Sequence, residues 1–218
     1  MTSTLAQIWL PHVPEPEPVI NRFAGSIDGF FTSPRDADAL VEFAEIDPSW
    51  RVLEPAAGEG AIVHALMRLA NPPREIVAIE LHKPFADNLR ASCEQYGDRV
   101  RVVNHDYFKT KAPDDNPFDM AVLNPPYQHF LDVRFVHKAL TDAHRAAALL
   151  LVNCLHNPKR AKVWNSAQVD KIDFLSKRPD PFENGNPKVY KPMREYIRIS
   201  ARRSEDTQRL HFPTIRFV

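Results

Sequence analysis

The stretch Asp119-Met-Ala-Val-Leu-Asn124-Pro125-Pro126-Tyr127 decides how the rest of the chain is interpreted. Residues 119–123 form a short apolar run that predicts a buried strand, and the Asn-Pro-Pro sequence ends it at once. Neither proline can donate a backbone N–H, and a residue before proline is held extended, so the motif predicts a stiff corner. This corner places an amide, a backbone carbonyl and a ring at the carboxyl end of a strand, where open α/β sheets bind ligands. Considered alone, the motif is equally well explained as an ordinary strand-to-loop turn.

The charge of the chain is balanced overall but divided along its length. With 28 basic and 28 acidic residues among 218, the total charge indicates no partner. Residues 1–155 carry 14 basic and 21 acidic side chains, whereas residues 156–218 carry 14 and 7. The basic C-terminal part indicates either a nucleic-acid face or a solvated surface.

The two cysteines, Cys93 and Cys154, are far apart, which argues against a disulfide framework and favours a reducing compartment. No pair of potential ligands has the spacing of a zinc site, so we expect no metal. No apolar run of membrane-spanning length and no signal-peptide pattern is found. We therefore expect a cytoplasmic protein that does not contact a membrane.

The order of apolar patterns predicts an α/β fold. Segments typical of buried strands alternate with helical periodicity, which predicts a parallel sheet with right-handed crossovers. The strands are predicted at residues 51–54, 75–80, 99–103, 119–123 and 146–152, and the helices from Pro34, after Gly60, at 84–95 and at about 131–145. Residues 157–167 appear helical, and residues 169–176 and 196–200 predict a strand pair with an antiparallel member at one edge of the sheet.

The domain organisation follows from composition. The proline-rich residues 1–27 predict a flexible N-terminal arm. Residues 28–203 form the main domain, and its basic insert at 156–195 is the candidate nucleic-acid face. Residues 204–218 are expected to form a tail.

Polar residues end four successive strands of the predicted sheet, namely Glu54, Glu80, Asp106 and Asn124. These ends converge on one edge, where they can face a ligand together. Gly58 and Gly60 lie between a strand and a helix without the lysine of a phosphate-binding loop, and Glu54 ahead of them favours a cationic or amino-bearing ligand.

The other strand ends favour a nucleoside. Glu80 can bind both ribose hydroxyls, and Asp106 can accept a bond from an exocyclic amino group while Tyr107 or Phe108 stacks on the base. An adenosine with a positively charged amino-acid tail, such as S-adenosylmethionine, satisfies these features.

The chain resembles S-adenosylmethionine-dependent amino-group methyltransferases in its ordered series of motifs. These motifs are Thr32-Ser-Pro34, Glu54-Pro-Ala-Ala-Gly-Glu-Gly60, Glu80, Asp106-Tyr-Phe108 and Asn124-Pro-Pro-Tyr127. They most resemble the adenine-N6 type that has a Thr-Pro motif ahead of the glycine loop. The resemblance covers residues 28–155 well and 168–200 loosely. It implies a Rossmann-like class I methyltransferase fold, with a mostly parallel seven-stranded sheet and an antiparallel edge strand.

The resemblance also implies the roles of individual residues. Those that bind S-adenosylmethionine would be Phe31, Thr32, Pro34, Glu54, Pro55, Ala56, Gly58, Gly60, Glu80, Asp106, Tyr107, Phe108 and Asn124. Ser33 separates Thr32 from Pro34, which departs from the motif of many relatives. The catalytic corner would be Asn124, Pro125, Pro126 and Tyr127.

At this corner, Asn124 Oδ1 and the Pro125 carbonyl would each accept a bond from the target amine, and Tyr127 would stack on a base flipped out of its helix. Further candidate substrate-binding residues are the aromatic Phe130 and Tyr190 and the basic Lys159, Arg160 and Lys188. For each of these, core packing or a solvated charge is the competing interpretation.

The expected function is adenine-N6 methylation, with DNA favoured over RNA as the substrate. A protein glutamine-N5 methyltransferase keeps the same chemistry, and an inactive methyltransferase fold that only binds its partner is a third hypothesis. About twenty residues follow the last predicted strand, so we expect sequence recognition to depend on the basic insert or on a partner chain.

Overall fold

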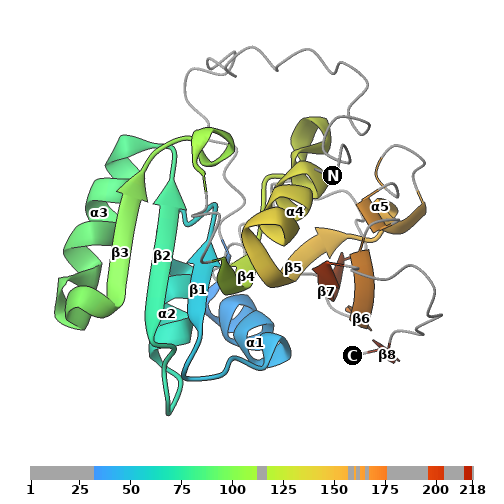
Figure 1. Ribbon diagram of the computed structural model, residues 1–218, viewed down its shortest axis with the longest axis horizontal. Helices are drawn as coiled ribbons and strands as arrows, with labels where there is room; N and C mark the ends of the chain where they lie inside the picture. Colours follow the sequence, from blue (N-terminus) through green and yellow to red (C-terminus); the bar gives the residue numbers. More distant parts are fainter. Residues whose placement is uncertain are drawn as a thin grey trace, which may run out of the picture.

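In the part of the chain that the structure describes, a twisted sheet of eight strands forms the centre of the protein (Figure 1). The computed structural model describes residues 32–111, 117–156, 160, 163–164, 167–175, 196–203 and 214–217. The strands are β1 (Arg51–Glu54), β2 (Glu75–Glu80), β3 (Val100–Asn104), β4 (Phe118–Leu123), β5 (Ala143–Leu151), β6 (Ala167–Phe174), β7 (Tyr196–Arg203) and β8 (Thr214–Phe217). Their order across the sheet is β3-β2-β1-β4-β5-β7-β6-β8.

Helices alternate with strands along most of the chain. They are α1 (Pro34–Ala44), α2 (Ala61–Met67), α3 (Lys83–Cys93), α4 (Leu131–Asp142) and the short α5 (Asn153–His156). Three 3₁₀ turns, Glu94–Arg99, Tyr107–Lys109 and Gln128–Phe130, complete the connections. Among the described residues, no helix is long and apolar enough to cross a membrane.

The order of the strands places the predicted site. β1 pairs in parallel with β2 on one side and with β4 on the other, so the direction of winding reverses at β1. Ligands of open α/β sheets bind outside the carboxyl ends of the strands at such a reversal. Glu54 at the end of β1 and Asn124 after β4 therefore follow neighbouring strands.

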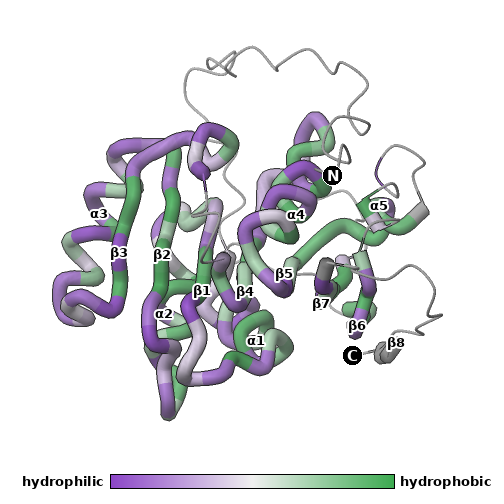
Figure 2. The backbone as a smooth tube through the Cα atoms, in the orientation of Figure 1, coloured by the Kyte–Doolittle hydropathy of each residue, from purple (hydrophilic) through white to green (hydrophobic). Residues whose placement is uncertain are grey.

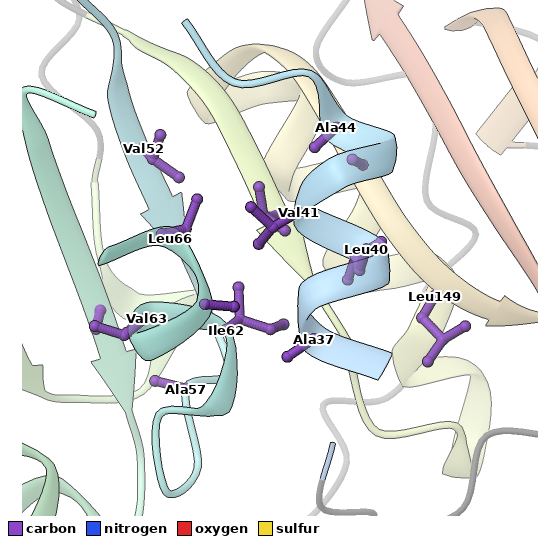
Figure 3. Packing of buried hydrophobic residues seen from close by; sticks show 14 of the residues in the cluster. Ala37, Leu40, Val41, Ala44, Val52, Ala57, Ile62, Val63, Leu66 and Leu149 are labelled. Carbon is purple, nitrogen blue, oxygen red and sulfur yellow. The ribbon is translucent and has the colours of Figure 1, made fainter. Parts of the chain in front are cut away.

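Alternate residues of the strands face two hydrophobic clusters. One cluster joins α1, α2 and α3 to one face of the sheet through residues such as Leu40, Ile62 and Leu89. Figure 3 shows Ile62 and Leu66 of α2 lying between β1 and Val41 of α1. The other cluster packs α4 against the opposite face, and Figure 2 shows that β5, which contributes to both clusters, is hydrophobic along most of its length.

The structure confirms the predicted α/β architecture with a mostly parallel sheet. Two details differ. The antiparallel strand β7 lies between β5 and β6 and is not the outermost strand, and β8 pairs in parallel with β6 inside the segment predicted as a tail. β8 is as short as β1 but lacks the glycine loop that marks the end of β1, which explains why it was not predicted.

The other differences are at boundaries. Residues 143–145 begin β5 although they were predicted as the end of a helix. Most of the helix predicted at 157–167 lies outside the described residues.

Candidate active site

Asn124 is held at both ends of its amide. Its Nδ2 atom donates to Thr32 Oγ1 at 2.9 Å, and its Oδ1 atom accepts from the Tyr127 hydroxyl at 2.6 Å. The same hydroxyl lies 3.4 Å from the backbone oxygen of Leu149 on β5. A carbonyl oxygen has two lone pairs, so one acceptor position on Asn124 Oδ1 remains for another N–H.

The start of α1 brings Thr32 to this corner. Ser33 caps the helix by accepting a bond from the backbone N–H of Asp36 at 3.1 Å, and Pro34 occupies the first turn, as predicted. Arg198 of β7 donates to the backbone oxygen of Ala39 at 2.8 Å, which fixes α1 against the sheet. The Thr-Ser-Pro sequence therefore reaches Asn124 even with Ser33 inserted.

The glycine loop has the conformation that its sequence requires. Gly58 has φ 53° and Gly60 has φ 87°, both in the region that glycine adopts without steric cost. A Cβ atom on Gly60 would lie 2.2 Å from Leu89 Cδ1, whereas one on Gly58 would meet nothing within 4 Å. Gly60 therefore serves packing, and Gly58 faces open space at the ligand edge.

The Glu80 carboxylate is bound by backbone groups of two loops. Its Oε2 atom accepts from the N–H of Gly58 at 2.8 Å, and its Oε1 atom accepts from the N–H of His82 at 2.7 Å. The side chain is 7% exposed. These bonds hold the carboxylate beside the glycine loop, at the position from which an acid binds a ribose.

Glu54 is the most unusual of the strand-end acids. The residue is 2% exposed, and its Oε2 atom has no hydrogen-bond partner. Burial raises the pKa of Glu54 well above its usual range; a hydrogen bond from the Val63 backbone opposes this shift, and the nearby Glu80 adds to it. A buried carboxylate oxygen without a partner is costly, and a ligand ammonium or N–H group would satisfy it.

Asp106 caps the 3₁₀ turn that follows β3. Its Oδ1 atom accepts from the N–H of Phe108 at 3.0 Å, and its side chain is 33% exposed. The Tyr107 ring is buried and stacks on Phe135 of α4, with centroids 5.4 Å apart. Tyr107 therefore faces the core in this structure. Phe108 is half-buried and packs edge-on against the same Phe135, with centroids 4.8 Å apart.

One apolar side chain at the ligand edge was missed in the sequence. Leu81 follows Glu80 directly and is 61% exposed, an unusually high fraction for a large hydrophobic residue. A base or another apolar group could cover it. Exposure cannot be inferred from residue type, so no pattern singled out Leu81 beyond its position after the acid.

Two predicted substrate contacts have other surroundings in the structure. The Tyr127 ring is 4% exposed and packs edge-on against Tyr196, with centroids 5.9 Å apart. Its face is therefore not open to a base, and this corrects the expected stacking role in this structure. Phe130, which is 37% exposed, is the accessible ring at the corner.

Arg160 is likewise not a surface cation. It is 9% exposed and forms an ion pair with Asp132, which is completely buried. A guanidinium in that position is unavailable to a phosphate, so the predicted phosphate contact is replaced by a structural one. The remaining predicted residues Phe31, Lys159, Lys188 and Tyr190 lie outside the described part of the chain.

The strand-end residues are thus brought to one edge. Pro125 is buried and Pro126 half-buried at the corner, and Pro55 and Ala56 lead into the glycine loop. Within the described ranges, no group of three or more histidine, cysteine or acidic residues is arranged to hold a metal ion.

Comparison with known proteins identifies the family of folds to which this sheet belongs. Residues 52–148 match a family model described as a methyltransferase domain. A dimethyladenosine transferase from Plasmodium falciparum superposes with a TM-score of 0.59 at 20% identity, over 80% of this chain and 63% of that chain. The fold is that of a class I methyltransferase.

Curated relatives match parts of the chain. An rRNA methyltransferase of Streptomyces thermotolerans is 38% identical over 104 residues, which is 48% of this chain and 33% of the relative. A tRNA1(Val) (adenine(37)-N6)-methyltransferase of Bacteroides thetaiotaomicron is 30% identical over 42% of this chain and 39% of its own length. A release factor glutamine methyltransferase of Neisseria gonorrhoeae is 29% identical over 49% and 42%, respectively. The chain thus spans less than half the length of each of these relatives.

S-adenosylmethionine is the cofactor that the class I methyltransferase fold implies, and three features of the site fit it. The partnerless Glu54 oxygen matches the ammonium of the amino-acid tail, and the open space beside Gly58 allows a ligand to approach the backbone. Glu80 lies beside the same loop, as binding of a ribose requires.

Proposed function

We propose that this protein transfers a methyl group from S-adenosylmethionine to the N6 amino group of adenine in a nucleic acid. The observation that carries the proposal is the Asn124 amide, which is oriented by Thr32 and Tyr127 and keeps one acceptor position on Oδ1. Asn124 follows β4, next to the strand that ends in Glu54, whose Oε2 atom has no hydrogen-bond partner. An acceptor for an amine thus lies beside a site for a cationic cofactor.

The chain supplies positioning and hydrogen bonds to the reaction. The adenine amine is conjugated with its ring, which makes its lone pair a poor nucleophile. Asn124 Oδ1 and the Pro125 carbonyl would each accept one N–H bond and draw the nitrogen toward tetrahedral geometry. S-adenosylmethionine supplies the electrophilic methyl: the N–C bond forms as the C–S bond breaks, and the nitrogen then releases one proton to solvent. Orientation of the two reactants accounts for much of the acceleration.

RNA is supported as the carrier of the adenine at least as well as DNA. The relatives whose names specify a nucleic acid act on rRNA or tRNA, and one of them on adenine N6. The DNA preference drawn from the Thr-Ser-Pro motif has no comparable support among them. We therefore propose RNA as the first substrate to test and keep DNA as the alternative.

A second candidate function is methylation of a protein glutamine. The relative from Neisseria gonorrhoeae carries that activity in its name. The planar amide nitrogen of glutamine needs the same two acceptors as adenine, so the corner alone does not distinguish the substrates. The excess of basic residues in 156–218 favours a polyanion over a protein.

The discriminating experiment supplies methyl-labelled S-adenosylmethionine with RNA, single-stranded DNA, duplex DNA and a protein extract in separate reactions. We expect label in RNA, and we expect Asn124→Ala to abolish it. Asn71→Ala is the matched control, because Asn71 is exposed and precedes β2 at the opposite end of the strands. Label in protein but in no nucleic acid, recovered as N5-methylglutamine, would support the glutamine function. If calorimetry shows cofactor binding but no substrate becomes labelled, the protein is an inactive binding module.

A further inference from the structure

The backbone just after the corner is held in a conformation that ordinary residues avoid. His129 has φ 49° and Phe130 has φ 62°, two successive non-glycine residues in the left-handed region. Each such residue is disfavoured sterically, and the conformation persists only where neighbouring groups hold it. What holds this turn therefore also determines where the corner lies.

Arg160 contacts the chain on both sides of this turn. Its Nη2 atom donates to the backbone oxygen of Tyr127 at 3.3 Å, before the turn, and its Nη1 atom forms the ion pair with Asp132, after it. The guanidinium carbon also lies 5.0 Å from the centroid of the Phe130 ring, within the turn. One buried side chain thus connects the end of the corner to the first turn of α4.

We propose that Arg160 is a positioning residue of the proposed methyl transfer, which holds Tyr127 so that its hydroxyl stays on Asn124 Oδ1. The inference rests on the proposed function. The path runs from the guanidinium to the Tyr127 carbonyl, and from the hydroxyl of the same residue to the Asn124 amide. Arg160 belongs to the segment predicted as the basic insert, so this segment contributes to the orientation of the target-amine acceptor.

The three contacts require the shape of arginine. A guanidinium is a planar fork that can donate in two directions and present a face to an aromatic ring. A lysine ammonium can keep the charge pairing with Asp132 but cannot make all three contacts at once. Arg160→Lys is therefore a mild variant that keeps the ion pair and weakens the positioning.

The chain contains a matched control for a purely stabilising role. Arg51 forms an ion pair with Glu75 at 2.6 Å and lies 4.9 Å from the centroid of the Phe118 ring. Its side chain is 12% exposed, and that of Arg160 is 10% exposed. Arg51 begins β1, at the end of the sheet opposite to the site. Arg51→Met thus removes a partly buried ion pair and a ring contact of the same kinds without touching the corner.

The test compares Arg160→Met, Arg160→Lys and Arg51→Met with the wild-type protein. Methyl transfer to the accepted substrate is measured together with cofactor affinity by calorimetry, thermal unfolding, and hydrogen exchange of peptides covering residues 124–132. We expect Arg160→Met to lower kcat by up to about 100-fold, as misplacement of a reacting group does, with cofactor affinity unchanged. Arg160→Lys should fall between it and the wild type, and Arg51→Met should lower stability only.

Hydrogen exchange distinguishes a failure of this inference from a failure of the proposed function. Arg160→Met should accelerate exchange in 124–132, and Arg51→Met should leave that peptide unchanged. If the wild-type protein methylates no substrate, the proposed function fails and the exchange comparison alone decides whether Arg160 holds the corner. If Arg160→Met does not fold, Arg160→Lys decides in the same way. Wild-type kcat and wild-type exchange in the folded Arg160 variants would overturn the inference.

Discussion

The Tyr127 hydroxyl donates a 2.6 Å hydrogen bond to Asn124 Oδ1, the atom expected to receive the target amine. The tyrosine of the corner therefore acts on the neighbouring amide in this structure, while its ring faces Tyr196 in the core. Because Thr32 accepts from the other end of the same amide, the orientation of Asn124 is fixed before a substrate arrives. Groups oriented in advance need no reorganisation during the reaction.

Tyr127→Phe tests this relationship directly. The variant keeps the buried ring and removes the bond to Asn124, so we expect stability to fall by about 1 kcal/mol. The methyl-transfer rate should fall by about tenfold, which corresponds to roughly 1.4 kcal/mol of transition-state stabilisation. Tyr96→Phe is the control, because it removes a 3.0 Å contact of a tyrosine hydroxyl with His64 instead. Equal rates for the two variants would contradict the orienting role.

The buried Glu54 carboxyl predicts that cofactor binding releases a proton from the protein. Burial raises the pKa of this carboxyl in the folded protein, so its contribution to stability is present at low pH and is lost as pH rises through the folded pKa. A cofactor ammonium favours the ionised carboxylate and should expel the proton. Calorimetry in buffers of different ionisation enthalpy measures this release, and Glu54→Gln should abolish it. Cofactor binding without release of a proton would contradict the pairing of Glu54 with the cofactor ammonium.

The half-buried His64 predicts that the free energy of unfolding falls at acidic pH. Burial, with the charge of Arg68 adding to it, lowers the pKa of His64 in the folded state. The neutral imidazole lies 3.0 Å from the Tyr96 hydroxyl and 3.2 Å from Ser92 Oγ. Its contribution is therefore fully present above the unfolded pKa of about 6.5 and is lost as pH falls through the folded value.

Urea unfolding of the wild type and of His64→Gln between neutral and acidic pH measures this contribution. The variant should show a smaller loss of stability on acidification than the wild type. His82→Gln, at an exposed histidine, should behave like the wild type. A wild-type acid dependence in His64→Gln would show that other groups cause it.

The two loop glycines should respond differently to alanine. Gly60→Ala would place a side chain at φ 87° and 2.2 Å from Leu89, so we expect a loss of about 3 kcal/mol from strain and overpacking. Gly58→Ala meets open space at φ 53° and should lose only about 1–2 kcal/mol, but it should weaken cofactor binding because the added methyl faces the ligand. Equal cofactor affinity in Gly58→Ala and the wild type would contradict the placement of the ligand.

Much of the fold followed from the sequence because its periodic patterns are long and its punctuation is strong. Ser33 and Pro34 start α1 as predicted, and the Asn-Pro-Pro sequence ends β4 at Leu123. β8 was not predicted because, unlike the equally short β1, no glycine loop follows it to mark its end. Ala143 to Arg145 suit a helix as well as a strand.

For the site, strand order brought Glu54, Glu80, Asp106 and Asn124 to one edge, and this convergence could be predicted from alternation alone. The directions in which individual side chains point could not be predicted in this way. Tyr107 and Tyr127 point into the core because Phe135 and Tyr196 pack against them. Arg160 is held in the interior by its ion pair with Asp132. Each of these contacts joins residues distant in sequence, beyond the reach of local patterns.

The central claim is that Asn124 accepts an adenine amine for methylation. It is tested most directly by incubating RNA with S-adenosylmethionine and the protein, digesting the RNA to nucleosides and measuring N6-methyladenosine by mass spectrometry. We predict N6-methyladenosine with the wild type and with Asn71→Ala, and a loss of at least about 100-fold with Asn124→Ala. Undiminished N6-methyladenosine with Asn124→Ala, or methylation at another atom of the nucleoside, would contradict the claim.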